Sequence, residues 1–438
     1  MTSTQGDTGK PALIRSIGAM GVGLLALNSM IGAGIFALPS VAATQAGNLT
    51  PWLFLAIGVL FLTVVLSFAE LTSFFRDSGG PVLYTTTAFG PLVGFSTGWI
   101  FYISRMTAFS ANVTAMAIYL GAIWPWIATE FGRISFIIFI CIGLTAANYV
   151  GVKDGIRTIA AFTFLKLVPL LLLVLLGLKE FTGDTFLPAQ FPDIDDFGGL
   201  TLLIIYAFVG FEAATVVSGE TRNPRRTMPG SLVTTVVATA FLYFLIVMVF
   251  ISVLPEGERA DTTLVDVGRK LAGSWGAYVI GLAAVFSIGG NLAANMLSVP
   301  RLTFALGELR MLPRWFATVH PRYSTPGNSV LLLGGLCLVL ALTGSFALLA
   351  AASSLTRLIA YGLCIAALPV IRQNASEEDK ARSFTLIGGY TIPVIAFSLC
   401  VWIGAQSTPD AWMITGSLLM LGFGLFWLAK KQAHTGND

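Results

Sequence analysis

The chain has 438 residues, of which 55% are hydrophobic and only 11% are charged. This charged share is about half of that in soluble globular proteins, and it cannot cover the outside of a water-soluble body of this size. The formal net charge of +3 is small and gives no reason to expect a nucleic acid partner. The composition therefore argues against a soluble enzyme or binding module. It indicates an all-α membrane protein whose outer surface meets the lipid bilayer.

Apolar segments repeat along the chain almost without a break. A helix of about 20 apolar residues crosses a bilayer, and this length predicts twelve transmembrane helices. They lie near residues 15–46, 51–75, 91–123, 133–151, 155–178, 197–220, 228–254, 273–306, 328–344, 346–371, 384–405 and 411–430. We expect a single transmembrane domain over 15–430, with a disordered tail at 1–14 and a second tail at 431–438.

The positions of lysine and arginine predict how these helices are oriented. With the N-terminus in the cytoplasm, the inner loops and tails hold 16 of the 25 basic residues. Four more lie within helices, and the outer loops hold only Arg133, Lys179, Arg259, Arg269 and Lys270. We therefore expect a multi-pass protein of the cell's inner (plasma) membrane with both termini on the cytoplasmic side.

Two of the expected helices are interrupted at matching positions. The first contains two glycines one residue apart, in the run from Ser29 to Phe36, and the sixth contains the run from Tyr206 to Glu212 with Gly210 at its centre. Glycine weakens a helix, and free backbone groups are tolerated at membrane depth only where protein or a water-filled cavity satisfies them. Close helix packing could explain either glycine run alone. The pair, five helices apart, favours a solute site between inverted repeats.

The ends created by these breaks predict what the site binds. The half-helix that begins near Gly34 presents free N–H groups and a positive dipole end, which suit a carboxylate. Unpaired carbonyls at Met30, Tyr206 and Val209 suit an ammonium group. An amino acid satisfies both sets at once. The expected substrate-binding residues are Met30, Ile31, Gly32, Ala33, Gly34, Tyr206, Ala207, Phe208, Val209 and Gly210.

These motifs resemble those of the amino acid–polyamine–organocation (APC) family of transporters. The resemblance covers nearly the whole chain. It rests on the first-helix run Gly32-Ala33-Gly34-Ile35-Phe36, on Gly79-Gly80-Pro81 with Tyr84, and on Phe208-Val209-Gly210-Phe211-Glu212. The run Glu220-Thr221-Arg222-Asn223-Pro224-Arg225-Arg226 with Pro229, and the segment from Leu312-Pro313 through His320-Pro321-Arg322 to Thr325-Pro326, add to it.

The resemblance implies a five-plus-five inverted repeat with broken helices 1 and 6, followed by two additional helices. The first repeat would cover about 15–178, the second about 197–371, and the additional helices about 384–430. In such relatives the first-helix glycine motif binds the substrate carboxylate and an aromatic residue of the sixth helix gates the site, which here is Tyr206. Ala33 departs from the serine that many relatives carry, which removes one possible hydrogen bond to the carboxylate.

Charged residues at membrane depth are costly and are functional candidates. Lys166 lies well inside the fifth helix. In some relatives a comparable lysine, after a start like Gly151-Val152-Lys153, takes the place of the sodium ion of sodium-coupled members. Lys166 therefore has two interpretations, a group that gains and loses a proton during transport, or a permanently charged strut bonded to first-helix carbonyls.

Glu212 directly follows the sixth-helix break, where acid-dependent exchangers of the family have a proton-sensing glutamate. It could therefore titrate. We expect instead a buried charge network in which Glu212 pairs with Arg105 of the third helix or Arg357 of the tenth, because a buried charge that persists normally has a partner. The coupling candidates are thus Lys166 and Glu212.

Small or weakly polar residues on the third, eighth and tenth helices favour a substrate with an uncharged side chain of modest size. These residues are Ala108, Ala111, Asn112, Asn291, Asn295, Ser353 and Ser354. We expect sodium-independent transport, proton-coupled or by exchange. Lys166 opposes a sodium site, and so does Gly289-Gly290, which by rough alignment replaces the eighth-helix hydroxyls that such a site would use.

Other functions remain as alternatives. The first is an efflux carrier or antiporter for cationic amino acids or polyamines, and the less favoured ones are a channel or a membrane-embedded enzyme. No phosphate-binding loop, metalloprotease motif or nucleophile elbow occurs in the chain. Two histidines and four scattered cysteines predict no metal site, and we expect no cofactor. An accessory subunit and the oligomeric state are left open.

Overall fold

A computed structural model describes residues 17–75, 79–151, 156–186, 196–386 and 388–435 of the chain. The expected tail at 1–14, Lys153, and the last three residues of the expected tail at 431–438 lie outside the described residues. Within them the chain is helical, as predicted, and no strand is present; an isolated bridge joins Ile17 to Thr221.

Apolar helices cross the molecule along its long axis. The first half consists of α1 (Ala19–Met30), α2 (Gly34–Ala46), η1 (Gly47–Leu49), α3 (Thr50–Phe74), α4 (Gly80–Phe89), α5 (Pro91–Gly121), α6 (Pro125–Ala128), α7 (Glu130–Val150), α8 (Ile156–Gly177), η2 (Leu178–Glu180) and α9 (Gly183–Phe186). Here α marks an α-helix and η a 3-10 helix. The short helix α4 begins at Gly80, within the Gly79-Gly80-Pro81 motif, in a stretch where no helix was expected.

The second half begins with a similar helix followed by a break. It consists of α10 (Phe197–Phe208), η3 (Phe211–Glu220), α11 (Pro224–Val253), η4 (Glu256–Glu258), α12 (Leu264–Glu308), η5 (Arg314–Ala317), α13 (Gly327–Thr343), α14 (Phe346–Asn374), α15 (Glu377–Arg382), α16 (Thr391–Ala405) and α17 (Pro409–Thr435). Six helical segments in the described part are long and apolar enough to cross a membrane, and shorter apolar helices accompany them. The class of integral membrane protein is therefore confirmed.

One expected boundary falls at a kink, and another was wrong. The eighth helix, expected near 273–306, follows a kink at Ala272 and Gly273, whose φ/ψ angles are not helical, and a capped helical segment that begins at Leu264 precedes the kink. The eleventh helix begins at Thr391 and not near 384, because Gly388 and Gly389 have positive φ angles that end regular helix on their N-terminal side.

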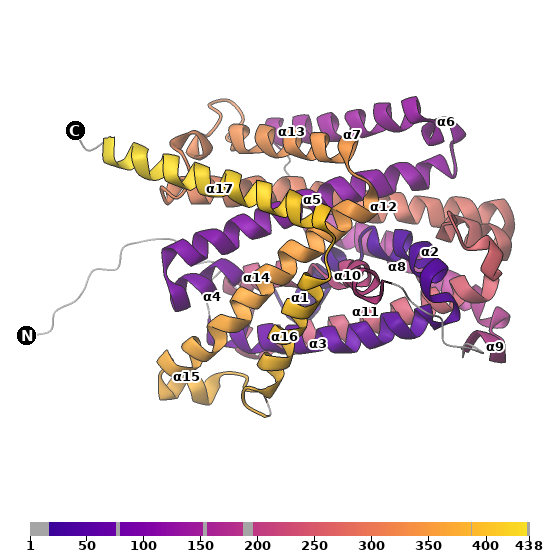
Figure 1. Ribbon diagram of the computed structural model, residues 1–438, viewed down its shortest axis with the longest axis horizontal. Helices are drawn as coiled ribbons and strands as arrows, with labels where there is room; N and C mark the ends of the chain where they lie inside the picture. The colour runs from indigo at the N-terminus through magenta and orange to yellow at the C-terminus, as the bar shows by residue number, and fades with distance from the viewer. Residues whose placement is uncertain (1–16, 76–78, 152–155, 187–195, 387, 436–438) are drawn as a thin grey trace, which may run out of the picture.

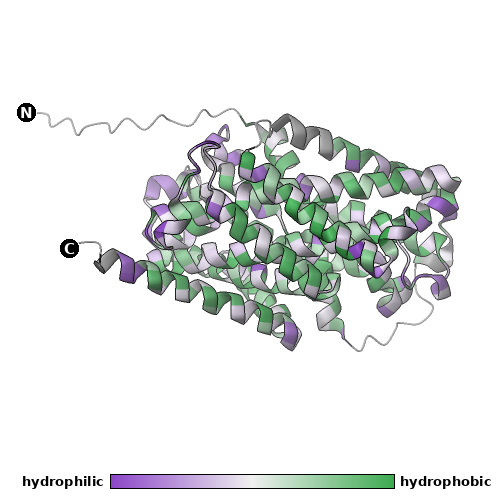
Figure 2. Ribbon diagram, turned by 90° about the horizontal axis from the view of Figure 1, so that it is seen from above, coloured by the Kyte–Doolittle hydropathy of each residue, from purple (hydrophilic) through white to green (hydrophobic). Residues whose placement is uncertain are grey.

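The connecting elements gather at the two ends of the bundle (Figure 1). The short helices α4 and α15 lie at the end that the C-terminal end of α17 also reaches, and α6 and α9 lie at the opposite end. Hydrophobic residues prevail along the middle of the helices and hydrophilic residues gather towards these ends (Figure 2). This distribution is the one that a bilayer around the middle of the bundle requires.

A buried ion pair ties the helices together at the end that carries α15. Arg372, near the end of α14, donates from Nε and Nη2 to the two carboxylate oxygens of Glu70 on α3, at 2.7 Å each. The Leu386 amide donates to the same carboxylate at 3.1 Å. Glu70 has no solvent exposure and Arg372 is partly exposed, so the pair is bidentate and its carboxylate is desolvated.

At the opposite end Arg259 has a structural role. Its guanidinium donates to the carbonyls of Leu254 and Ile251, at the end of α11, and to Asn48 Oδ1 beyond α2, at 3.0, 3.3 and 2.8 Å. A cation at a helix C-terminus is favourable. This arginine, which was expected in an outer loop, therefore joins the end of the first expected span to the end of the seventh.

Candidate functional site

The first break lies where the sequence predicted it. Helix α1 ends at Met30, α2 begins at Gly34, and the three residues between them are not helical. Ile31 leaves the helical region with φ −77° and ψ 89°. The break thus exposes the carbonyl end of α1 and the amide end of α2 to the centre of the molecule.

The second break is also confirmed, with one difference. Helix α10 ends at Phe208, Val209 is extended, and Gly210 has φ 118°. The chain then continues as the 3-10 helix η3 and not as α-helix. The N–H of Gly210 donates to the Glu212 carboxylate at 2.9 Å, so this acid caps the element that follows the break.

The two breaks touch each other at backbone level. A Cβ atom on Gly210 would lie 2.6 Å from the carbonyl oxygen of Ser29, and one on Gly34 would lie 2.8 Å from the Cα atom of Ala207. Both distances are shorter than real Cβ contacts. The glycines therefore permit the contact between the interrupted segments, in addition to weakening the helices.

Side chains from three other helices bind the exposed carbonyls of α1. Lys166 Nζ on α8 donates to Asn28 and Ile31 at 2.9 and 2.8 Å. Further donors come from α11 and α12: Tyr243 to Met30 at 3.3 Å, Ser287 to Ile31 at 3.1 Å and Asn291 to Ser29 at 3.3 Å. Lys166 is fully buried. The carbonyl contacts expected of Lys166 as a strut are present.

Two expectations about this end were wrong. The Met30 carbonyl is not unpaired, because it accepts from Tyr243 and from the Gly32 amide at 2.9 Å. An eighth-helix hydroxyl is also not missing: Ser287, two residues before Gly289, supplies it and donates to the carbonyl that also accepts from Lys166. The rough alignment on Gly289-Gly290 overlooked Ser287, which lies less than one helical turn from Gly289.

A ladder of amides leads from this end of α1 across the site. Asn291 Oδ1 accepts from Asn112 Nδ2 at 3.0 Å and from Asn295 Nδ2 at 2.8 Å. The Tyr206 hydroxyl donates to Asn112 Oδ1 at 3.1 Å. Ser287, Asn291 and Asn295 are spaced four residues apart, so they occupy one face of α12. Tyr206, the expected gate, is thereby fixed to α5 and linked to the first break.

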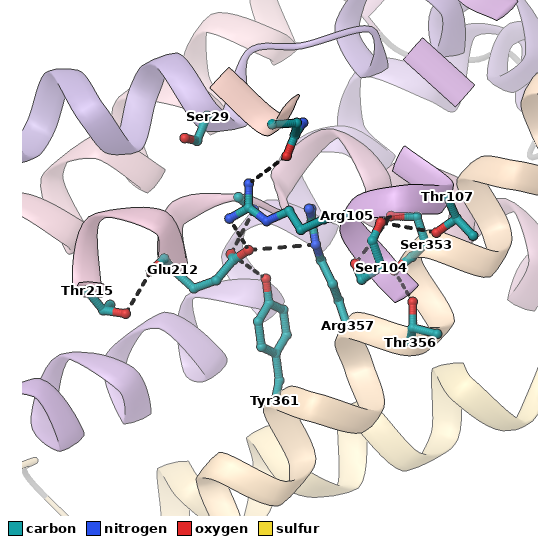
Figure 3. A network of polar contacts seen from close by, with 12 residues as sticks. Ser29, Ser104, Arg105, Thr107, Glu212, Thr215, Ser353, Thr356, Arg357 and Tyr361 are labelled. Carbon is teal, nitrogen blue, oxygen red and sulfur yellow. Dashed lines mark hydrogen bonds and ion pairs between the residues drawn. The ribbon is translucent and has the colours of Figure 1, made fainter. Parts of the chain in front are cut away.

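Glu212 lies at the centre of the predicted charge network. Arg105 Nη2 of α5 and Arg357 Nε of α14 lie 3.2 and 3.7 Å from its Oε1 atom. The Tyr361 hydroxyl donates to Oε2 at 2.7 Å. Figure 3 shows these side chains pointing toward one another from α5, η3 and α14. The expected pairing is confirmed, and it involves both arginines.

Arg105 joins the two networks. Its Nη1 atom donates to Asn295 Oδ1 at 3.4 Å while Nη2 faces Glu212. A continuous path of polar contacts therefore runs from the first break through the amide ladder to Glu212 and Tyr361. All ten expected substrate-binding residues are buried, so the two breaks are closed to solvent in this conformation.

Several contributors to the site were missed by sequence reasoning. Tyr361 stands four residues after Arg357, and Ser287 stands four residues before Asn291, so helical spacing could have indicated both. Tyr243 gave no such signal, because a tyrosine in an apolar helix usually belongs to the core. Ser353, expected to line the pocket, donates instead to the Ser104 carbonyl at 3.0 Å.

Interrupted helices that enclose a buried polar site within a bundle of membrane helices define a membrane transporter. Residues 17–428 match the amino acid permease family model, and the chain belongs to this family, within the APC transporters. An uncharacterized transporter of Mycobacterium tuberculosis is 30% identical over 88% of this chain and 87% of its own. Two transporters of Bacillus subtilis are each 26% identical. They are the branched-chain amino acid permease BcaP, over 90% and 89% of the two chains, and the serine/threonine exchanger SteT, over 96% and 98%.

Proposed function

We propose that the protein carries neutral amino acids of small to medium size by alternating access, without sodium, either coupled to protons or by exchange. The observation that carries this proposal is the contact between the two breaks. It places the amide end of α2, which begins at Gly34, beside the carbonyl end of α10 near Ala207. Amide N–H groups with a positive dipole end suit a carboxylate, and free carbonyls suit an ammonium group.

The amide and carbonyl ends divide the binding roles between the two breaks. Because side chains already bind the carbonyls of α1, the substrate ammonium group would bind the carbonyls of Tyr206 and Val209. The carboxylate would bind the amides of Ala33 and Gly34, and Gly32, whose amide donates to the Met30 carbonyl, would lie beside it. The remaining expected residues, Met30, Ile31, Ala207, Phe208 and Gly210, would form the walls of the site.

The arrangement of helices supports twelve spans with both termini in the cytoplasm. Broken helices stand first in each half, and α4 and α15 lie opposite α6 and α9 (Figure 1). That alternation is what a five-plus-five inverted repeat over about 15–178 and 197–371 would produce, with α16 and α17 as the additional helices. The distribution of basic residues supports a cytoplasmic location for the end with α4 and α15.

The buried charges support an uncharged substrate side chain. Among the described residues near the site, the cations are Lys166, Arg105 and Arg357, whereas Glu212, which pairs with the two arginines, is the one acid. A cationic side chain or a polyamine would add to this excess of positive charge. The names of BcaP and SteT point the same way, since branched-chain residues, serine and threonine are all neutral.

Lys166 supports independence from sodium. Its ammonium group sits between the Asn28 and Ile31 carbonyls, and carbonyl oxygens are the ligands that a monovalent cation would also use. The lysine is therefore a fixed substitute for such an ion. A proton gained and lost by Lys166 or by Glu212 during the cycle would couple transport to protons, and a permanent charge on both would leave exchange.

Counterflow in proteoliposomes tests the proposal. Vesicles loaded with one unlabelled amino acid are diluted into a trace of the same labelled compound, at several pH values and with sodium replaced by choline. We expect saturable accumulation of leucine, valine, serine or threonine, unchanged by sodium. An imposed proton gradient that drives uptake into empty vesicles would identify coupling, and its absence would identify exchange.

Three outcomes would contradict the proposal. Accumulation of lysine, arginine or putrescine in place of neutral amino acids would favour the cationic antiporter. Non-saturating flux without counterflow would indicate a channel. A requirement for sodium would show that Lys166 does not replace the ion. In each case vesicles prepared without protein serve as the control.

A further inference from the structure

A large open cavity lies away from the buried breaks, at the end of the bundle that carries α15. Its volume is about 1070 Å³, and it opens between α3, the beginning of α11 and the segment that follows α15. The lining residues are Leu66, Asn223, Pro224, Arg225, Arg226, Pro229, Gly230, Val233, Thr234, Ala381, Arg382, Ser383 and Phe384. None of them belongs to the site between the breaks.

One end of this groove is cationic. Arg225 and Arg226 come from the first turn of α11 and Arg382 from the last turn of α15. Two carboxylates lie beside them: Asp379 pairs with Arg225 Nη2, and Glu378 pairs with Arg382. The Nε and Nη1 atoms of Arg225 are buried and have no hydrogen-bond partner among the described residues. Buried donors left unpaired are costly, and an anion in the groove would satisfy them.

The other end of the groove is apolar and lies deeper in the bundle. Leu66 stands eight residues before the end of α3, and Val233 stands nine residues after the start of α11. At 1.5 Å per residue, both lie about 12–14 Å inside their helix ends. The groove therefore runs from charged residues at the surface of the bilayer towards the hydrocarbon.

We propose that this groove binds an anionic phospholipid of the cytoplasmic leaflet. The phosphate would lie against Arg225, Arg226 and Arg382, and an acyl chain would follow Leu66 and Val233. Basic pockets between membrane helices on the cytoplasmic side have the charge that such headgroups require. A free phosphate ion would use the same arginines but would leave the apolar half of the groove unfilled. The inference does not depend on which solute is carried.

Native mass spectrometry of the full chain tests the proposal. Protein delipidated in mild detergent is titrated with phosphatidylglycerol or with phosphatidylcholine of the same acyl chains, and the bound fraction is measured. We expect a clear preference for phosphatidylglycerol. Arg225→Gln and Arg226→Gln should each lower the retention of phosphatidylglycerol about fivefold. Arg301→Gln is the matched control. This arginine is exposed, near the C-terminal end of α12, and does not line the groove.

A charge change of opposite sign separates binding from folding. Asp379→Asn removes the acid beside Arg225 and keeps all three arginines, so it should raise phosphatidylglycerol retention severalfold. It remains informative if Arg225→Gln fails to fold. Equal retention of phosphatidylglycerol by wild type, Asp379→Asn and the double arginine variant would overturn the proposal. Thermal stabilisation of the lipid-free protein by inorganic phosphate, with no preference between the lipids, would assign the groove to a free anion and overturn it as well.

Discussion

The ammonium group of Lys166 lies 2.8 Å from the carbonyl oxygen of Ile31, the residue at which the first span stops being helical. The cation thus stands at the negative end of α1, where a positive charge is favoured. It also ties α8 to the residue next to the proposed carboxylate site. A change in the charge of Lys166 would therefore act on the backbone that binds the substrate.

We expect Lys166→Ala to lower counterflow of neutral amino acids at least tenfold. The variant leaves the Asn28 and Ile31 carbonyls without their shared donor, and the loss of hydrogen bonds to a charged group is worth about 1.5–3 kcal/mol each. Lys179→Ala, at an exposed lysine of η2, is the control and should transport normally. Full activity of Lys166→Ala, with an unchanged pH profile, would show that the lysine has no part in transport.

Glu212→Gln should destabilise the protein by about 3–5 kcal/mol, because it leaves two buried arginines without their counter-charge. The amide oxygen can still accept from Tyr361 and from the Gly210 N–H, but the NH2 group that replaces Oε1 cannot accept from Arg105, so the effect combines a lost charge with a lost acceptor. Thermal unfolding in detergent measures it. Adding Arg357→Met should restore part of the loss, since it removes one uncompensated cation. Glu180→Gln, in a surface pair with Lys179, should change stability by less than about 1 kcal/mol. A Glu212→Gln protein as stable as wild type would show that the network is not needed for folding.

Gly210→Ala should abolish transport and reduce the yield of folded protein. A side chain at this position meets the Ser29 carbonyl and must also adopt φ 118°, a region that costs residues other than glycine about 1–3 kcal/mol. Gly143→Ala is the control, because this helical glycine on α7 has open space around it, and alanine there should be neutral or slightly stabilising. Normal uptake by Gly210→Ala would mean that the two breaks separate freely during transport.

Glu70→Gln should destabilise the protein by several kcal/mol without changing substrate preference. It breaks the bidentate pair with Arg372 and leaves a partly buried cation beside Tyr390. The midpoint of thermal unfolding and the relative counterflow of valine and serine measure the two effects. A changed preference would show that the ion pair reaches the substrate site through α3 or α14.

Tyr206→Phe should raise the KM for neutral amino acids about fivefold, with a smaller effect on the maximal rate. The variant keeps the ring that packs edge-on against Phe346 at 5.9 Å. It removes the hydroxyl that holds Asn112, a hydrogen bond worth about 1 kcal/mol. An unchanged KM would show that the amide ladder does not position the gate.

Local physics made much of the fold and of the site predictable. The length of the apolar segments predicted the long helices, and the glycine runs predicted both breaks to within a residue. The free-energy cost of burying a charge predicted that Glu212 pairs with Arg105 or Arg357, because a charge at membrane depth needs a partner. These inferences need only the chain's own composition and spacing.

Contacts between distant helices were not predictable in the same way. Nothing in the sequence around Tyr243 indicates that its hydroxyl meets the end of α1, because the packing of α11 against α1 decides this contact; the spacing of Ser287 from Asn291 indicates a shared face of α12 but not which carbonyl the hydroxyl meets. The Met30 carbonyl was expected to be free for the same reason, since its partners stand more than 200 positions away or across a non-helical turn. The start expected for the eleventh helix was wrong because hydrophobicity predicts where a helix can lie but not the sign of a φ angle, such as that of Gly388.

The crossed contacts of the two glycines have a mechanical consequence. Gly210 is seated against Ser29 before the first break, and Gly34 is seated against Ala207 before the second, so each broken helix blocks the other from sliding alone along its axis. We therefore expect a movement of one broken helix along its axis to displace the other, because their backbones lie close together at both breaks. Such coupling would suppress leakage of solute through the protein, because a pathway open to both sides of the membrane at once would require the two breaks to separate.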